Sequence, residues 1–491
     1  MQVRQLLDGV AYKSYKDGLD TEISDIVYDS RKVVPGVAFV AIKGNRSDGH
    51  QYISEVIQKG ASVVFVQEQV ETESSIPVIE MEDTRKGLAQ LSANYFGQPA
   101  KKLITIGITG TKGKTTTSWM IKSILEAAGK KTGVIGTMGV FVGGKHYETN
   151  NTTPESYDIH KYFREMADEG VEYVIMEVSS QALKMHRTDG IQFDFGIFTN
   201  LTRDHIGDGE HASMEEYIHC KSLLFQQSRH GILNLDDAHY PEMTVHATSD
   251  IHTFGKTPEA DLRLKDFGYE QKVGNLGIRA ELEGIFEDSI FIGIPGDFSV
   301  YNAMAAIETA KLLKIADSDI KKALAEVQVK GRVEPVKVSD RFTVLIDYAH
   351  NGVSMQSVLE MIRGYHPKRI VSLFGCGGNR SKERRYDMGE ISGKMADYSI
   401  ITADNSRYED VNDIIADIVE GISRTEGKYI TIPDRRSAIK YSIEHAEEGD
   451  VVLILGKGHE DYQEINGVRY PFDERVVIHE VTEELKQAHS S

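Results

Sequence analysis

Residues 103–117, LITIGITGTKGKTTT, combine a strand-like segment with the groups that bind a nucleotide phosphate. Apolar and β-branched residues fill the first half, and Gly107 and Gly110 interrupt them before Gly113-Lys114-Thr115. In a phosphate-binding loop, backbone N–H groups face the anion, a lysine reaches the β- and γ-phosphates, and a threonine hydroxyl holds Mg²⁺. The chain is therefore predicted to bind a nucleoside triphosphate. The contacts are expected from Gly110, Thr111, Lys112, Gly113, Lys114, Thr115 and Thr116.

The spacing of this loop departs from the usual pattern. A glycine normally stands five positions before the second loop glycine, but Ile108 occupies that place and the glycine is at position 107. Gly110, inside the loop, can supply the positive φ instead. An ordinary strand-to-helix turn that contains Gly-Lys-Thr is the alternative, although the strand, the glycines, the lysine and the threonine run all agree with phosphate binding.

Polar side chains follow two further predicted strands of the central part. The apolar run of VEYVIMEVSS ends at Glu177. The strand in FDFGIFTN is followed by four polar residues, Asn200, Arg203, Asp204 and His205. Because parallel strands end at one edge of a sheet, we expect these groups near the phosphate loop, where they could hold Mg²⁺. For Glu177 the alternative is a carboxylate that caps the next turn. Lys221 lies on an apolar helix face, so by residue type alone its stem packs while its ammonium reaches water.

The C-terminal part repeats this arrangement of polar groups after predicted strands. Asp347, the segment GGNRSKERR, residues 404–407 and residues 456–460 each follow an apolar strand. The same loops concentrate positive charge, which suits an anionic or carboxylate-bearing ligand. The charged residues are Arg380, Lys382, Arg384, Arg385, Arg407 and Lys457.

The elements that position these groups form three blocks of alternating strands and helices. We expect domains at residues 1–100, 101–332 and 333–491, which agrees with the length of 491 residues. The predicted fold class is α/β: a small first domain, a central parallel-sheet domain with the phosphate loop, and a C-terminal Rossmann-like domain.

Composition narrows the functional classes. The formal net charge is −19 and there is no long basic run, so extended nucleic-acid contact is not expected. Cys220 and Cys376 fit no metal or disulfide spacing, which favours a reducing compartment. The first residues become polar too soon for a signal peptide, and no apolar run is long enough for a membrane span. We expect a cytoplasmic, monomeric protein that acts on small molecules.

Nine motifs together resemble the Mur ligase family. They are GITGTKGKTTT, NTTPE, MEVSSQALKMHR, TNLTRDH, HCKSLLF, VKGRVE, DYAH, FGCGGNR and LGKGHEDYQ. The resemblance covers essentially the whole chain and is strongest to the ligases that add the third amino acid to the cell-wall precursor. It implies three domains, for the UDP end of the precursor, for ATP and for the amino acid. It also implies amide formation through an acyl phosphate, as in ATP-dependent acid–amino-acid ligases.

The resemblance assigns further roles to residues at matching positions. The UDP-MurNAc-dipeptide would contact Ser30, Thr152, Thr153, Ser179 and Arg187. Asn302, Arg332 and Asp347 would lie around the adenine, ribose and phosphate of ATP. The catalytic and metal-binding groups would be Lys114, Thr115, Glu177, His205 and Lys221. Lys221 matches a lysine that becomes a carbamate and then serves a second Mg²⁺.

The choice of amino acid depends on Asp404-Asn405-Ser406-Arg407. Relatives that add meso-diaminopimelate carry Asp-Asn-Pro-Arg at these positions. This chain keeps the arginine, as Arg407, but has Ser406 in place of the proline. Arg407 would hold the distal carboxylate of diaminopimelate, which lysine lacks. By resemblance the site would be completed by Arg385, Asp404, Asn405, Gly456 and Glu460.

Alternatives remain open at this stage. Asn351-Gly352 replaces the usual Thr-Pro, so a related enzyme that uses lysine, another amino acid or another carboxylate carrier is possible. A nucleotide-binding regulatory protein without turnover is a different class, which the intact Lys114, Thr115, Glu177, His205 and Lys221 disfavour.

Overall fold

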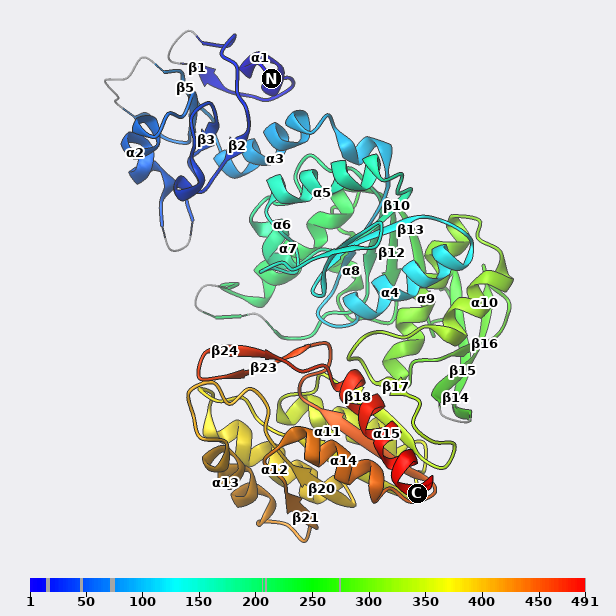
Figure 1. The fold of residues 1–491 in the computed structure, drawn as a ribbon. Helices are drawn as coiled ribbons and strands as arrows, with labels where there is room; N and C mark the ends of the chain where they lie inside the picture. The colour runs from blue at the N-terminus through cyan, green and yellow to red at the C-terminus, as the bar shows by residue number, and fades with distance from the viewer. Residues whose placement is uncertain are drawn as a thin grey trace. The chain divides into compact units, whose positions relative to one another are not determined.

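The computed structural model describes residues 1–14, 18–44, 47–70, 76–204, 206–207, 210–272 and 275–490. The chain divides into two compact units (Figure 1). The first unit comprises residues 1–263, 284–286 and 304–320, and the second comprises residues 264–283, 287–303 and 321–491. His205 lies outside the described residues.

The first unit begins with a small sheet whose strand order is β1-β5-β4-β3-β2. Strands β2 to β5 are parallel and β1 is antiparallel to β5. The strands are β1 (Lys13–Ser14), β2 (Ile26–Val27), β3 (Ala38–Val40), β4 (Val63–Val66) and β5 (Val78–Glu80). The helices are α1 (Val3–Leu6), α2 (Ile53–Gln58) and α3 (Thr84–Tyr95). Strands β3 and β4 are wholly buried, as their apolar runs predict.

The rest of the first unit is built on a parallel sheet with the strand order β13-β12-β11-β6-β10-β7. The antiparallel strands β8 and β9 continue it beyond β7. The parallel strands are β6 (Ile104–Thr109), β7 (Thr132–Gly136), β10 (Tyr173–Glu177), β11 (Phe193–Phe198), β12 (Ser228–Asn234) and β13 (Asp250–Gly255). The edge strands are β8 (Gly139–Val142) and β9 (Lys145–Tyr147). The helices are α4 (Lys114–Ala127), α5 (Ser156–Asp168), α6 (Ser180–Lys184), α7 (Met214–Gln226) and α8 (Tyr240–Thr244).

Strand β6 occupies the centre of this sheet, between β10 and β11. Gly107 lies inside β6, where a Cβ atom would come within 3.1 Å of Leu224 on α7. Its role is therefore close packing of a helix on the strand. This accounts for the shifted glycine of the loop motif, because the turn itself uses Gly110.

The second unit contains a sheet with the strand order β17-β18-β22-β19-β20-β21, all parallel except β17. Its strands are β17 (Glu334–Val336), β18 (Thr343–Asp347), β19 (Arg369–Phe374), β20 (Tyr398–Ile401), β21 (Tyr429–Thr431) and β22 (Asp450–Leu455). A hairpin follows, formed by β23 (Tyr462–Ile465) and β24 (Val468–Pro471). The helices are α11 (Gly352–Arg363), α12 (Lys382–Met395), α13 (Val411–Ile422), α14 (Arg435–Glu444) and α15 (Glu474–Ser490).

Two strand ends of this sheet are fixed by a buried ion pair. Arg435 contacts Glu474 at 2.6 Å, and both side chains are fully buried. The same guanidinium donates hydrogen bonds to the carbonyls of Ala403 and Leu455, which follow β20 and end β22. The loops that carry the predicted amino-acid site therefore start from a rigid base.

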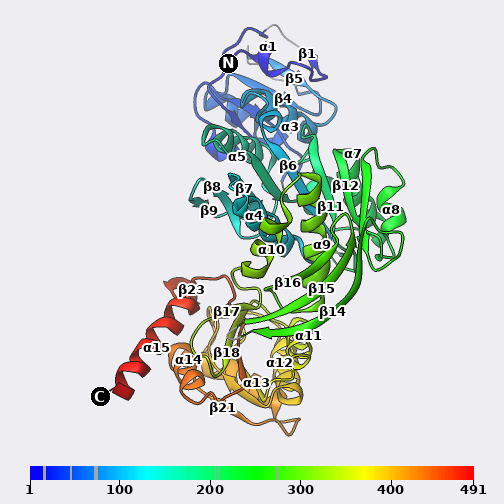
Figure 2. The same ribbon diagram turned by 90° about the vertical axis from the view of Figure 1, so that its right-hand side faces the viewer.

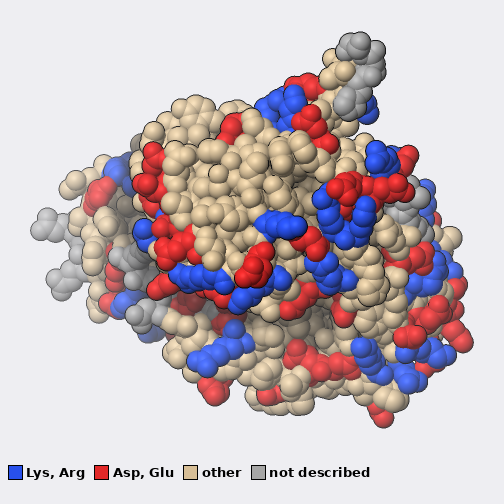
Figure 3. All heavy atoms as spheres, turned by 90° about the horizontal axis from the view of Figure 1, so that it is seen from below, with Lys and Arg blue, Asp and Glu red and all other residues tan. Residues whose placement is uncertain are grey.

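Strands β14 to β16 were not among the predicted elements. They are β14 (Leu262–Lys272), β15 (Asn275–Gly284) and β16 (Asp288–Ile292), and they lie side by side in Figure 2. The helices α9 (Asp297–Leu312) and α10 (Asp317–Glu326) follow them. Within the described ranges no helix has the length and apolar character needed to cross a membrane. Basic and acidic side chains are interspersed on the face shown in Figure 3. The predicted α/β class with parallel sheets is confirmed.

Candidate active site

The phosphate loop connects β6, at the centre of its sheet, to the first turn of α4. Gly110 and Gly113 have φ values of 148° and 88°, which only glycine adopts readily. A Cβ atom on Gly110 would lie 2.0 Å from the hydroxyl of Thr199. Lys114 and Thr115 are the first two residues of α4, and the backbone N–H groups at a helix N-terminus favour an anion. The predicted strand, loop and helix are present.

The end of the neighbouring strand β11 holds the loop in this shape. The backbone N–H of Thr111 donates to the carbonyl of Asn200 at 2.9 Å, and that of Lys112 donates to the Asn200 side chain at 3.0 Å. The Thr199 hydroxyl donates to the Lys112 carbonyl at 2.7 Å. Asn200 was predicted among the polar groups at this strand end, whereas Thr199 was not predicted as a site residue. The position of Thr199 at the end of the same apolar strand is the signal that could have identified it.

Two lysines converge on one carbonyl oxygen of this loop. Nζ of Lys114 donates to Gly110 O at 2.8 Å and to Thr111 O at 3.1 Å, while Nζ of Lys221 donates to Gly110 O at 2.9 Å. Lys221 projects from α7, is buried, and lies 4.6 Å from the ring centre of Tyr217. Burial, and then the charge of Lys114, lower the pKa of Lys221 well below its usual value. The side chain of Lys221 does not reach water as the sequence reading alone suggested.

Glu177 is held at the end of β10 by three hydrogen bonds. Oε1 accepts from the Thr115 hydroxyl at 2.9 Å and from the Thr137 backbone N–H at 3.1 Å. Oε2 accepts from the Thr137 hydroxyl at 3.0 Å. Glu177 therefore does more than cap the next turn, since it meets the first turn of the phosphate-loop helix. A carboxylate beside a threonine hydroxyl is a hard-oxygen donor set that fits Mg²⁺.

Four residues predicted to contact the precursor gather next to Glu177. The Thr153 hydroxyl donates to Glu177 O at 2.8 Å and accepts from the backbone N–H of Ser179 at 3.0 Å. Thr152 reaches Thr137 through a hydroxyl contact of 3.1 Å. Arg187 donates to Thr153 O and pairs with Glu155, both at 2.9 Å.

Ser30 lies in the first domain, in a short 3₁₀ turn between β2 and β3. Its carbonyl accepts a hydrogen bond from Lys59 at 3.0 Å. Ser30 thus belongs to the small N-terminal sheet region, whereas Thr152, Thr153, Ser179 and Arg187 follow β9 and β10.

In the second unit, Arg332 and Asp347 lie near each other at the end of β18. The Asp347 carboxylate is buried and accepts from the backbone N–H groups of Val333 and Ala349, both at 2.8 Å. Burial raises its pKa, which the Arg332 charge opposes. The Arg332 guanidinium stacks over the Tyr348 ring at 5.6 Å. Asn302, in the first turns of α9, is buried.

The predicted amino-acid site is a hydrogen-bonded cluster after β20 and β22. Nδ2 of Asn405 donates to Glu460 at 2.9 Å, and Oδ1 accepts from Lys457 at 3.0 Å and from the Glu464 backbone N–H at 2.9 Å. Lys457 is fully buried and also contacts Glu460 at 3.2 Å. The sequence predicted Lys457 only as part of the basic cluster. It did not predict that Lys457 would lie between Asn405 and Glu460.

Arg407 takes a left-handed backbone conformation, with a φ value of 52°. Its guanidinium donates to Gly378 O at 2.8 Å, and its backbone N–H donates to Glu464 O at 3.0 Å. Asp404 accepts from the backbone N–H of Asn405 at 2.6 Å. Gly456, with a φ value of 114°, lets the chain pass close to the Asp404 carboxylate. The structure therefore brings Asp404, Asn405, Gly456 and Glu460 together.

Arg385 is buried among carboxylates. It contacts Asp417 at 2.8 Å and both oxygens of Glu409 at 2.9 Å. Lys382 also pairs with Asp417, at 3.1 Å. The basic cluster predicted from the sequence is thus partly neutralised by acidic partners on α13 and the loop before it.

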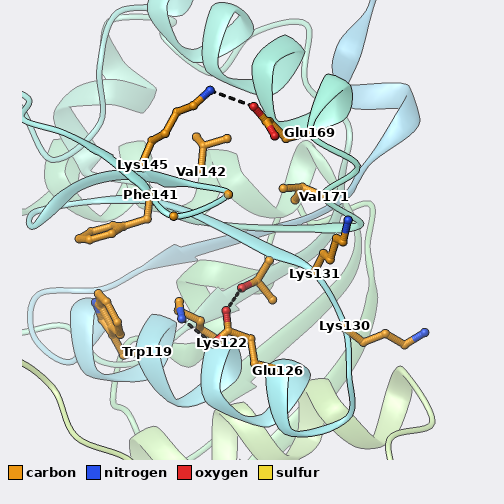
Figure 4. A pocket seen from close by; sticks show the side chains of 13 residues that line it. Trp119, Lys122, Glu126, Lys130, Lys131, Phe141, Val142, Lys145, Glu169 and Val171 are labelled. Carbon is orange, nitrogen blue, oxygen red and sulfur yellow. Dashed lines mark hydrogen bonds and ion pairs between the residues drawn. The ribbon is translucent and has the colours of Figure 1, made fainter.

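A pocket of about 580 Å³ lies between α4 and the β7–β8 strands. Figure 4 shows Lys145 directed toward Glu169, and Lys122 toward Glu126. Lys130 pairs with Glu172 at 3.6 Å. The lysines of this pocket are thus largely paired with glutamates. None of the predicted site residues lines the pocket.

Comparison with known proteins identifies the family of this chain. Three models match consecutive segments: "Mur ligase family, catalytic domain" at residues 22–96, "Mur ligase middle domain" at 108–310, and "Mur ligase, glutamate ligase domain" at 331–458. The expected three-domain architecture is confirmed by these matches. The domain boundaries at residues 100 and 332 remain predictions.

Relatives match along the full chain. A UDP-N-acetylmuramoyl-L-alanyl-D-glutamate--2,6-diaminopimelate ligase of Clostridium perfringens is 41% identical over 490 residues, which are 98% of this chain and 100% of that protein. The ligase of the same name from Caldanaerobacter subterraneus is 40% identical over 99% of this chain and 100% of its own length. A solved structure of a ligase with this name is 27% identical, covers 99% of both chains and has a TM-score of 0.76. The chain belongs to the Mur ligase family.

Proposed function

We propose that this protein is an ATP-dependent ligase that joins meso-diaminopimelate to UDP-MurNAc-L-Ala-D-Glu in the synthesis of the peptidoglycan precursor. The full-length relatives carry the name of this reaction. The structural observation that carries the proposal is the meeting of the phosphate loop, Glu177 and Lys221 at one edge of the central sheet. A ligase that adds lysine, or uses another carboxylate carrier, is the second candidate, because Ser406 replaces the family proline.

The first half of the reaction transfers a phosphoryl group. The side-chain carboxylate of the precursor's D-glutamate attacks the γ-phosphorus of ATP, a new acyl O–P bond forms, and ADP leaves. Lys114 places a positive charge at the loop, where it offsets charge on the phosphate oxygens. The N–H groups at the start of α4 bind the same anion. The amine of the amino acid then attacks the acyl carbon, and inorganic phosphate leaves as the amide forms.

Mg²⁺ would be held by the Thr115 hydroxyl and the Glu177 carboxylate, with His205 added by resemblance. When bound, the ion supplies positive charge to the phosphates. Thr137 orients Glu177 through two hydrogen bonds, so the carboxylate points to α4 before a nucleotide arrives.

Lys221 is suited to become a carbamate. Its lowered pKa favours the neutral amine, whose lone pair can form an N–C bond to CO₂ with loss of one proton. The product is an anion next to Lys114. Carbamylation would thus add an attraction between the carbamate and the Lys114 ammonium, and would add oxygen ligands for Mg²⁺.

The precursor would bind beside Glu177, along Thr152, Thr153, Ser179 and Arg187, with its UDP end near Ser30. Glu155 pairs with Arg187 in this structure. A carboxylate or phosphate of the precursor would compete for the same guanidinium.

The nucleotide's base and sugar would be met by Asn302, Arg332 and Asp347. The Arg332 guanidinium over Tyr348 forms a flat cationic surface. The Asp347 carboxylate fixes two backbone segments through its accepted hydrogen bonds, so its contribution is to shape this site.

The amino acid would bind at Asp404, Asn405, Arg407, Gly456 and Glu460. Arg385 would act on this site from a distance. Glu409 accepts hydrogen bonds from Arg385 and from the backbone N–H of Asn379. Gly378, the residue before Asn379, accepts a hydrogen bond from Arg407 through its carbonyl oxygen. Arg385 is therefore a positioning residue for Arg407.

The proposed setting is the cytoplasm, with a monomer as the active form and domains at residues 1–100, 101–332 and 333–491. Phosphate release tests the activity directly. Protein, ATP and Mg²⁺ should release phosphate only when both UDP-MurNAc-L-Ala-D-Glu and meso-diaminopimelate are present. Release that needs neither the precursor nor an amino acid, or no release with any amino acid, would overturn the ligase assignment.

A further inference from the structure

Two histidines and an aspartate meet on strands β12 and β13, away from the site described above. Asp250 Oδ2 lies 3.7 Å from Nδ1 of His230 and 3.6 Å from Nε2 of His252. The ring centres of the two histidines are 5.6 Å apart. One ligand atom of each residue lies within 4.8 Å of the others.

Strand register explains why these three side chains share one face. His230 pairs directly with Asp250, and His252 follows Asp250 by two residues, so all three project to the same side. Asp250 is the first residue of β13, and His230 lies near the start of β12. The phosphate loop follows the carboxyl end of the parallel strand β6. The cluster therefore lies toward the opposite edge of the sheet and is independent of the proposed ligase site.

The distances fit metal ligands better than hydrogen bonds. Both N···O distances exceed the length of a good N–H···O bond, about 3 Å. With bond lengths of about 2.0–2.1 Å, two ligands of a tetrahedral zinc ion are about 3.3 Å apart. Small side-chain rotations would close the remaining difference.

The inward nitrogens of both histidines are buried. Nδ1 of His230 and Nε2 of His252 have no hydrogen-bond partner among the described residues, and each faces the Asp250 carboxylate. Buried imidazole nitrogens normally have a partner. The His230 ring also stacks on Phe195 at 5.3 Å, which restricts its orientation. The aspartate itself is exposed, so an ion can reach the cluster from solvent.

We propose that His230, Asp250 and His252 bind a transition-metal dication of the Zn²⁺ class. Two imidazole nitrogens and one carboxylate oxygen suit such an ion, and water would complete a tetrahedral shell. The site has a structural role, since it joins β12 to β13 near the start of both strands. Because the ion binds the folded protein, it raises the free energy of unfolding, and this gain grows with the logarithm of the ion concentration above the Kd.

The test is a Co²⁺ titration of tag-free, metal-stripped full-length protein, followed by visible absorption. Wild type should develop the strong visible bands of a tetrahedral cobalt site. His230→Asn and His252→Gln should lose these bands and bind at least about tenfold more weakly. The matched control is His246→Gln, an exposed histidine of the same region, which should behave like wild type.

A stability measurement separates loss of the site from loss of the fold. Zn²⁺ should raise the melting temperature of wild type and of His246→Gln, and should not raise that of Asp250→Asn. Asp250 is exposed, so this variant should melt like wild type without metal. Equal Co²⁺ spectra in wild type and the histidine variants, or no binding by wild type at micromolar Co²⁺, would overturn the proposal.

Discussion

Lys114 and Lys221 donate hydrogen bonds to the same oxygen, the carbonyl of Gly110, at 2.8 and 2.9 Å. Two ammonium groups at one acceptor repel each other, and burial adds to the cost for Lys221. The lowered pKa of Lys221 eases this conflict, because loss of its proton removes one of the two charges. A lysine that can meet the nucleotide thus lies beside a buried lysine on α7 whose neutral form, which burial favours, can react with CO₂.

Replacing Lys221 by alanine should reduce ligase activity at least about a hundredfold, because the Mg²⁺-facing anion is lost. Bicarbonate or a short carboxylic acid should restore part of the rate by filling the vacated space. Initial rates of phosphate release measure both effects. Lys161→Ala, at an exposed position of α5, is the control and should retain wild-type activity. Full activity of Lys221→Ala would remove the carbamate from the mechanism.

Replacing Gly110 by alanine should weaken ATP binding by at least about tenfold. The new methyl group would lie 2.0 Å from the Thr199 hydroxyl, and overpacking of this kind costs about 1–3 kcal/mol. Equilibrium binding of ATP is the measurement. Gly129→Ala is matched in that its φ is also positive, at 74°, but no atom lies within 4 Å of the new Cβ. That control should lose stability and keep its ATP affinity, whereas equal losses in both variants would show that the Thr199 contact is unimportant.

Replacing Arg407 by alanine should raise the KM for meso-diaminopimelate far more than the KM for ATP. A charge-assisted contact to the distal carboxylate is worth about 1.5–3 kcal/mol, or roughly 10- to 150-fold. Steady-state kinetics with each substrate varied in turn gives both constants. Arg424→Ala, at a half-exposed position just after the end of α13, should leave both unchanged. Similar increases in the two KM values would refute a role for Arg407 in specificity.

Replacing Glu308 by glutamine should stabilise the protein at alkaline pH and not at acid pH. Glu308 is buried on α9, and burial raises its pKa to about 8. The folded state thus favours the protonated form of Glu308. The contribution of this side chain to the free energy of unfolding is fully present below pH 4.5, its unfolded pKa, and is lost as the pH rises through about 8. The glutamine removes this loss, which amounts to about 4 kcal/mol at pH 8. Melting temperatures of wild type and variant should coincide at pH 4.5 and separate at pH 8, and a constant difference would contradict the assignment.

The order of elements and the phosphate loop could be predicted from local patterns. Apolar runs that end in glycine or polar residues locate β6, β10 and β11, and parallel pairing then brings Thr115 and Glu177 to one edge. The sequence also correctly predicted that Gly110 takes a positive φ. The loop requires a residue with a positive φ, and Gly107 precedes the loop.

Pairings between distant segments could not be predicted in this way. The neutralisation of Arg385 by Glu409 and Asp417 depends on how α12 packs on α13, which no local pattern specifies. The same holds for Lys221, since a lysine on an apolar helix face is usually solvated at its tip. Only the approach of α7 to the phosphate loop buries it against Gly110.

A competition between two amino acids tests directly whether this protein joins meso-diaminopimelate to the precursor. Protein, ATP, Mg²⁺ and UDP-MurNAc-L-Ala-D-Glu are incubated with equal concentrations of meso-diaminopimelate and L-lysine, and the product is identified by mass spectrometry. We expect a product heavier than the precursor by one diaminopimelate residue, with ADP and phosphate formed in equal amounts. A product that carries lysine, or ATP hydrolysis without any extended precursor, would contradict it.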